Sequence, residues 1–208
     1  VKWKNDSWGS GGLFPAGPPW NMVGPYDFDN DGFGDFVLSS SYAGQYCNGV
    51  YHYEAVSNDS VEIQWVYTFY DLSCDYDAYS SIAVGDLDGD KLMDIAAGAP
   101  GINSNLGSVY VWKGSDLQEN QTAPTIEFRS NQTRIGKEVH ISDVNNDGLG
   151  DLLIGEPKGT LTSDESEESQ SQTGLVHIFL GRTDISIFDG VQTIQEADVR
   201  ISIDIEQA

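Results

Sequence analysis

Three short acidic motifs contain the residues whose types and spacing most clearly suggest chemistry. Each motif places an oxygen-bearing side chain at positions 1, 3, 5 and 9 of a tight loop, a spacing that directs the side chains toward one centre. These residues are Asp27, Asp29, Asp31 and Asp35; Asp86, Asp88, Asp90 and Asp94; and Asp143, Asn145, Asp147 and Asp151. Calcium takes about six to eight oxygen ligands, so we expect the position-7 backbone carbonyls of Phe33, Leu92 and Leu149 to contribute as well. The sequence therefore predicts about three calcium ions.

The motifs differ from EF-hand loops in the way they end. An EF-hand closes with a Glu at position 12, where this chain has Leu38, Ala97 and Ile154. Short apolar runs follow each loop and indicate buried strands rather than helices. We therefore expect the position-9 carboxylate to close each site. One copy alone would also suit an ordinary surface turn rich in Asp, Asn and Gly, but three matched copies favour metal binding.

The elements that position these loops recur with them. The loops begin at Asp27, Asp86 and Asp143, which lie 59 and 57 residues apart, a period typical of propellers and other repeat arrays. An alternating strand follows each loop, and a short segment with a small residue precedes each one. The following strands are expected at 50–53, 109–112 and 176–179, and the preceding segments at 22–24, 81–85 and 135–139. Each unit fits one four-stranded propeller blade.

These repeats resemble the FG-GAP repeats of the integrin alpha-subunit N-terminal β-propeller. The resemblance rests on the three acidic loops, on Ile135-Gly136 at the Phe-Gly position, and on Gly98-Ala99-Pro100 with its relative Gly155-Glu156-Pro157. Two positions depart from the pattern: Ser39-Ser40-Ser41 replaces Gly-Ala-Pro in the first repeat, and Tyr79-Ser80 replaces Phe-Gly in the second. These departures affect the edges of the blades more than the metal loops.

The resemblance implies an all-β, integrin-alpha-like propeller region over residues 1–208. We expect repeats at about 20–75, 79–133 and 134–190, with a partial blade at 191–208, which makes about three and a half four-stranded blades. Alternating residues 199–205 suggest a strand without a partner. The remaining edges are covered by further chain, by a fourth blade built from 1–24 and 185–208, or by strand addition between copies.

The resemblance also implies a function. Calcium is expected to stiffen the blades at one face, and partners are expected to dock on loops 42–48, 101–107 and 158–174 of the opposite face. The chain is then a non-enzymatic extracellular module for adhesion, protein–protein interaction or structural assembly. Its partner is a protein or glycan ligand, or another copy of the chain. Two alternatives stay open, a glycan-binding lectin-type propeller and a non-catalytic accessory domain of a secreted enzyme.

The charge of the chain limits its partners. The formal net charge is −23, from 33 acidic and 10 basic residues, and eleven of the acidic residues occupy the oxygen positions of the three loops. Nucleic acids and anionic membrane surfaces bind basic patches, so we expect no nucleic-acid partner. No apolar run approaches about 18 residues, so we expect no direct membrane insertion.

Glycosylation motifs and cysteines favour a secreted or extracellular location. Four Asn-x-Ser/Thr sequons begin at Asn5, Asn58, Asn120 and Asn131. The only cysteines, Cys47 and Cys74, fall in connections on the same face when the repeats are aligned as blades. We expect a disulfide between them, with two buried thiols as the alternative.

Motifs for catalysis are missing from the sequence. It contains no Gly-x-Ser-x-Gly elbow, no His-Glu-x-x-His helix and no phosphate-binding Gly-Lys loop. His52 and His177 fall at near-equivalent positions of alternating strands, and His140 stands beside the third loop. We therefore expect no catalytic residues.

Overall fold

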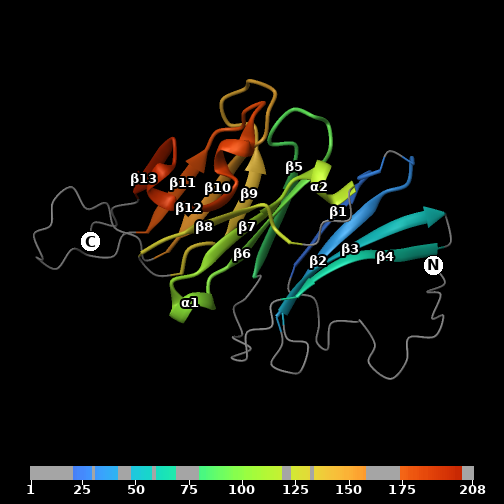
Figure 1. The fold of residues 1–208 in the computed structure, drawn as a ribbon, viewed down its shortest axis with the longest axis horizontal. Helices are drawn as coiled ribbons and strands as arrows, with labels where there is room; N and C mark the ends of the chain where they lie inside the picture. The colour runs from blue at the N-terminus through green and yellow to red at the C-terminus, as the bar shows by residue number, and fades with distance from the viewer. Residues whose placement is uncertain are drawn as a thin grey trace, which may run out of the picture.

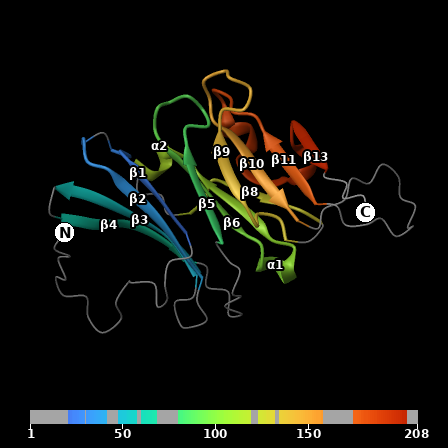
Figure 2. The same cartoon turned by 180° about the vertical axis from the view of Figure 1, so that it is seen from behind.

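The computed structural model describes most of the chain as three β-sheets. The described residues are 21–29, 31–41, 48–57, 60–68, 80–118, 123–131, 134–157 and 174–202. The sheets stand side by side, with the second between the first and the third (Figures 1 and 2). Helices in this part of the chain are single turns, and none is long and apolar enough to cross a membrane.

Each sheet follows the order of the chain from one edge outward. The first contains β1 (Asn21–Tyr26), β2 (Asp35–Ser41), β3 (Asn48–Ser57) and β4 (Ser60–Thr68). The second contains β5 (Ser81–Gly85), β6 (Asp94–Ala99), β7 (Ser108–Trp112), β8 (Ile126–Arg129) and β12 (Gly190–Thr193). The third contains β9 (Val139–Ser142), β10 (Asp151–Glu156), β11 (Leu175–Phe179) and β13 (Val199–Ser202). Each sheet contains four antiparallel strands in the pattern of a propeller blade, as the repeats predicted, and β12 adds a fifth, parallel strand to the second sheet.

Alternating apolar side chains build two core layers between the sheets. Val37 and Val50 of the first sheet pack toward Ile82, Ile95 and Trp112 of the second. The other face of the second sheet packs on the third through a separate cluster, whose largest members are Phe128, Ile135, Leu152 and Phe179. Every residue of β6 and β7 is buried, because both faces of the middle sheet are covered. Each fully buried large side chain contributes about 1.5–3 kcal/mol.

A close backbone contact gives the Gly-Ala-Pro and Phe-Gly motifs a physical role. A Cβ atom on Gly98 would lie 2.0 Å from the carbonyl oxygen of Gly136, so only glycine fits there. Gly136 has a φ of +79° and donates its N–H to the carbonyl of Gly155 at 2.9 Å. Ile135, at the Phe position, is fully buried. The two motifs therefore join consecutive repeats.

The segment between β11 and β13 crosses to the neighbouring sheet. It forms the 3₁₀ turn η1 (Ile185–Phe188), then β12, which pairs in parallel with β8, then the turn η2 (Ile194–Glu196). The chain then returns as β13, which pairs with β11. The expectation that residues 199–205 lack a partner is therefore wrong for Val199–Ser202. We call residues 180–198 the crossover segment.

Candidate metal centres

The three acidic loops lie at the same end of their sheets, where the first strand of each sheet turns into the second. They connect β1 to β2, β5 to β6 and β9 to β10, and Figure 1 shows these connections in blue, green and orange along the upper edge. The single-turn helix α1 (Ile102–Asn105) lies at the opposite edge, while α2 (Gly114–Gln118) lies near the second loop. Each loop therefore stands at the start of a buried central strand.

Carboxylates converge in the first two loops. Ligand atoms of Asp27, Asp29 and Asp35 lie within 4.8 Å of one another, as do those of Asp86, Asp88 and Asp90. No such carboxylate trio is found in the third loop, where Asn145 provides an amide and donates to Asp147 at 2.8 Å. Oxygen-only donors at this spacing suit a hard divalent cation such as calcium.

Backbone amides hold the loops in shape. Asp27 accepts the N–H groups of Asp31 and Gly32 at 3.0 Å each, and Asp143 accepts the equivalent pair, Asp147 and Gly148, at 3.1 and 2.9 Å. Asp86 accepts from Gly89 and Lys91 at 2.6 and 2.9 Å. These bonds direct the position-1 carboxylates inward, although each also occupies some of their lone pairs.

The position-9 aspartates connect each loop to its sheet. Asp35, Asp94 and Asp151 are fully buried. Each accepts one N–H from loop position 2 and one from a residue within two positions of the end of the third strand of its sheet. The pairs are Phe28 and Ala55 for Asp35, Leu87 and Gly114 for Asp94, and Val144 and Gly181 for Asp151, at 2.7–3.0 Å. These carboxylates therefore hold the loop against the third strand whether or not they also bind a cation.

Burial makes several of these carboxylates costly to ionise. It raises the pKa of Asp94 to about 7, and backbone hydrogen bonds from Gly114 and Leu87 only partly oppose the shift. Burial also raises the pKa of Asp35 and of Asp88. Repulsion from neighbouring aspartates also raises these pKa values in the first and second loops. A bound cation would remove this penalty, because it favours the ionised form.

A fifth acidic side chain, which the loop motif did not reveal, joins the first site. Glu54 on β3 places its carboxylate within 4.8 Å of Asp29 and Asp31. Burial, followed by the charge and hydrogen bond of Asp29, raises its pKa to about 7. Tyr53 pairs with Phe36, so the register of β3 brings Glu54 beside Asp35 and its loop. Aligning the third strands of the sheets on Tyr53, Trp112 and Phe179 could have found Glu54. The equivalent residues are Lys113 and Leu180, so the first repeat alone has an acidic side chain at this position.

Two of the three histidines lie in the interior of the protein. His52 and His177 are buried, and His140 is exposed on β9. Nε2 of His177 contacts a carboxylate oxygen of Glu156 at 2.9 Å, and Ser130 donates to the other oxygen of the same carboxylate. Ser130 and His177 therefore meet through Glu156 between the second and third sheets.

Other predicted sites lie mostly beyond the described residues. Cys47, Cys74, Asn5, Asn58 and Asn120 are outside them, so the disulfide and those glycosylation sites stay predictions. Asn131 is described and exposed. Of the predicted docking loops, 101–107 is described, and it contains α1.

Comparisons with known proteins agree with this geometry. The FG-GAP repeat family model matches residues 78–112, which include the second acidic loop. Integrin alpha-8 of Gallus gallus is 35% identical over 100 residues, 48% of this chain and 9% of that protein. Phosphatidylinositol-glycan-specific phospholipase D of Mus musculus is 30% identical over 132 residues, 59% of this chain and 14% of that protein. The chain thus corresponds to a small part of each relative. Its repeated loops, its side-by-side β-sheets and these similarities indicate an integrin-alpha-like β-propeller fold, with a match to the FG-GAP repeat over residues 78–112.

Proposed function

We propose that this chain is a calcium-stiffened, non-enzymatic extracellular module that supports adhesion or another protein–protein interaction. The observation that carries the proposal is the recurrence of one acidic loop at the same edge of three stacked sheets. In the first two loops the carboxylates already converge to within 4.8 Å. The integrin-type relatives support the interaction role.

Each loop would hold one cation through the side chains at positions 1, 3, 5 and 9 and the carbonyl at position 7. Calcium supplies positive charge where several carboxylates otherwise repel one another in a partly buried setting. It thereby fixes the turn between two strands of a sheet. The first loop, with Glu54, has the most acidic donors, and the third, with Asn145, has the fewest.

Chelation tests the proposal directly. Removing calcium is expected to lower the melting temperature by roughly 10 °C, because a loss of a few kcal/mol shifts Tm by several degrees in a domain of this size. Calorimetric titration of the calcium-free protein should show binding that Asp88→Asn weakens. Glu138→Gln, an exposed acid on the segment before β9, serves as the control and should bind normally. A melting temperature that chelator leaves within a degree or two would contradict an architectural role for calcium.

An edge for strand addition is a second candidate role. β13 is the outermost strand of the third sheet, and Val199 and Ile201 on it are 43% and 47% exposed. Only Arg200 interrupts them with a charge. Exposed apolar edge strands favour pairing with another chain. We therefore propose this edge as the place where a partner or a second copy would extend the sheet.

A further inference from the structure

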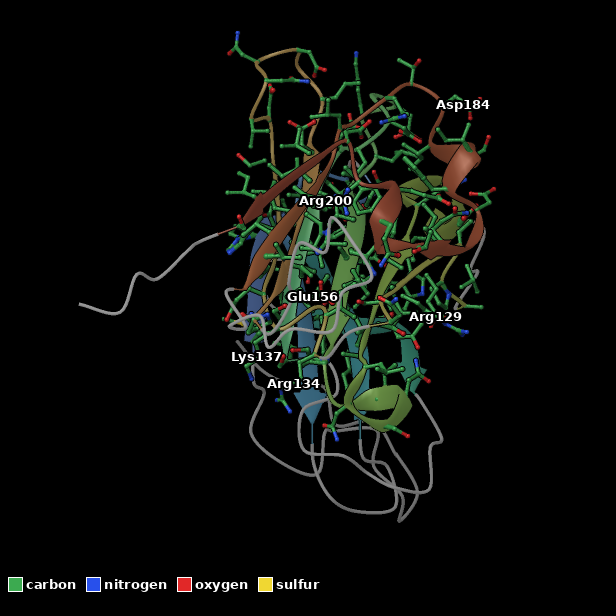
Figure 3. The ribbon with its side chains drawn as sticks, turned by 90° about the vertical axis from the view of Figure 1, so that its left-hand side faces the viewer. Arg129, Arg134, Lys137, Glu156, Asp184 and Arg200 are labelled. Carbon is green, nitrogen blue, oxygen red and sulfur yellow. The ribbon has the colours of Figure 1, made fainter. Side chains whose placement is uncertain are left out.

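A groove runs between the end of β8 and the crossover segment. Its volume is about 480 Å³, in the range of ligand-sized pockets. Arg129 and Asn131 line one side, and Val191, Thr193 and Gln195 line the other. Figure 3 shows Arg129 on the same flank as Asp184 and the red ribbon of the crossover segment. The groove lies at the end of the second sheet away from its acidic loop, because Arg129 pairs with Ser108, whereas Trp112 at the other end of β7 pairs with Ile95 beside the loop.

The lining of the groove is held in place by its own hydrogen bonds. Thr193 bonds through its hydroxyl to the side-chain oxygen of Gln195, and Nε2 of Gln195 donates to Oδ1 of Asn131 at 3.1 Å. Glu127 holds the guanidinium of Arg129 through two bonds of 2.8 Å. The amide oxygen of Asn131 is therefore directed toward Gln195, which leaves Nδ2 as its remaining polar atom.

We propose that Asn131 carries an N-linked glycan whose first sugars occupy this groove. Asn131 is exposed, begins the sequon Asn131-Gln132-Thr133, and is itself part of the groove wall. Amide and hydroxyl groups of the walls can form hydrogen bonds with the hydroxyl groups of a sugar. Val191, which is 58% exposed, can pack against the apolar face of the sugar ring. Transfer joins C1 of the sugar to Nδ2, breaks the C1–O bond of a lipid pyrophosphate-linked oligosaccharide, and releases one Nδ2 proton. The proposal rests on the extracellular location proposed above.

The glycan would protect an open sheet edge. β12 is the outermost strand of the second sheet and pairs on one side with β8. Its other side presents backbone groups beside the exposed Val191, a combination that favours unwanted strand pairing. The outer sugars of a chain anchored at Asn131 would extend out of the groove past Val191 toward this edge, and would leave the β13 edge of the third sheet open. The two outer edges would then differ in their availability to partners.

The test uses the full chain secreted from eukaryotic cells behind an added signal peptide. Four proteins are compared: the natural sequence, Thr133→Ala, Gln195→Ala, and Thr122→Ala, which removes the Asn120 sequon as a matched control. Glycopeptide mass mapping gives occupancy. Peptide N-glycosidase gives the rate of glycan release from native and denatured protein, and light scattering gives the assembly state.

We expect Asn131 to be occupied and its glycan to be released about tenfold more slowly from native than from denatured protein, the factor that one good hydrogen bond supplies. Gln195→Ala should remove most of this protection. Thr133→Ala should increase self-association, and Thr122→Ala should not. An unmodified Asn131 in the secreted protein, or equal release rates from native and denatured protein, would overturn the inference. Because secretion is imposed, neither result bears on calcium binding, which is measured separately.

Discussion

At the residue scale, one carboxylate has two tasks in each repeat. Asp35, Asp94 and Asp151 connect the loop to the end of the third strand through two backbone bonds, besides standing where a cation ligand is expected. Replacing any of them would leave two backbone amides without their acceptor, whether or not a cation is bound. The cost is about 1–3 kcal/mol for each buried amide, and both amides are buried in the case of Asp94. Substitutions are therefore better tests of metal binding at residues that contact the site but make no hydrogen bonds that connect the loop to the sheet.

Glu54 is such a residue. Glu54→Gln removes one of the carboxylates that converge at the first loop, so we expect calcium affinity there to fall by about tenfold. Glu62→Gln is the matched control, because Glu62 pairs directly across from Glu54 and is exposed outside the cluster. Calorimetric titration measures both. Equal calcium affinity in the two variants would show that Glu54 does not contribute to the first site.

His52 makes stability depend on pH. Burial lowers its pKa to about 4, more than the charge of Asp29 opposes, while its value in the unfolded chain is 6.5. The unfolded chain therefore takes up a proton first as the pH falls. The stability contributed by the neutral ring is present above pH 6.5 and is lost toward pH 4, by about 2 kcal/mol at pH 5.

We expect His52→Asn to flatten this pH dependence. Denaturant unfolding at pH 7 and pH 5 measures it, and His140→Asn, on an exposed histidine, should keep the dependence of the natural sequence. A slope that His52→Asn leaves unchanged would mean that the buried ring is not the titrating group.

At the element scale, the strands and loops that repeat could be predicted, and those that occur once could not. The acidic loops and the strands that follow them share one local pattern, and a 57–59-residue period reveals it three times. Among the described strands, β12 has no counterpart in the first and third sheets, and its parallel pairing with β8 depends on a route through space that local sequence does not encode. Glu54 was missed for a related reason, since the register between β2 and β3 places it.

The crossover segment is expected to stabilise the junction of the second and third sheets. Ile194 is 1% exposed in the second core layer, so Ile194→Ala should lower the free energy of unfolding by about 2–4 kcal/mol. Ile187, which is 57% exposed in the neighbouring turn, provides the control, and Ile187→Ala should change it by less than about 0.5 kcal/mol. Denaturant unfolding measures both variants. If both variants lost a similar free energy of unfolding, burial of Ile194 would not be the way in which the crossover segment stabilises the junction.

At the scale of the whole molecule, charge and open edges act together. The net charge of −23 opposes association between copies, and three divalent cations would offset six of these charges. The exposed residues Val199 and Ile201 favour association at the β13 edge. Calcium is therefore expected to influence assembly as well as stability.

Removing the outer strand tests the role of the β13 edge. Deletion of residues 198–208 should abolish calcium-dependent assembly, or unfold the third sheet by exposing β11. The substitution pair Val199→Lys and Ile201→Lys, which keeps the strand, should prevent assembly while the protein stays folded. Light scattering and circular dichroism, with and without calcium, measure the two effects. Unchanged assembly of the folded double-Lys variant would exclude the β13 edge as the site of assembly.

The crossover segment also sets an order for events during synthesis. The third sheet cannot receive its outer strand, β13, until the chain that forms β12 of the second sheet has been synthesised. Both strands come after all the other described strands, so the second and third repeats finish together rather than one after the other. A nascent chain halted before Gly190 would therefore leave two repeats incomplete, and the two would be expected to fold as one cooperative unit.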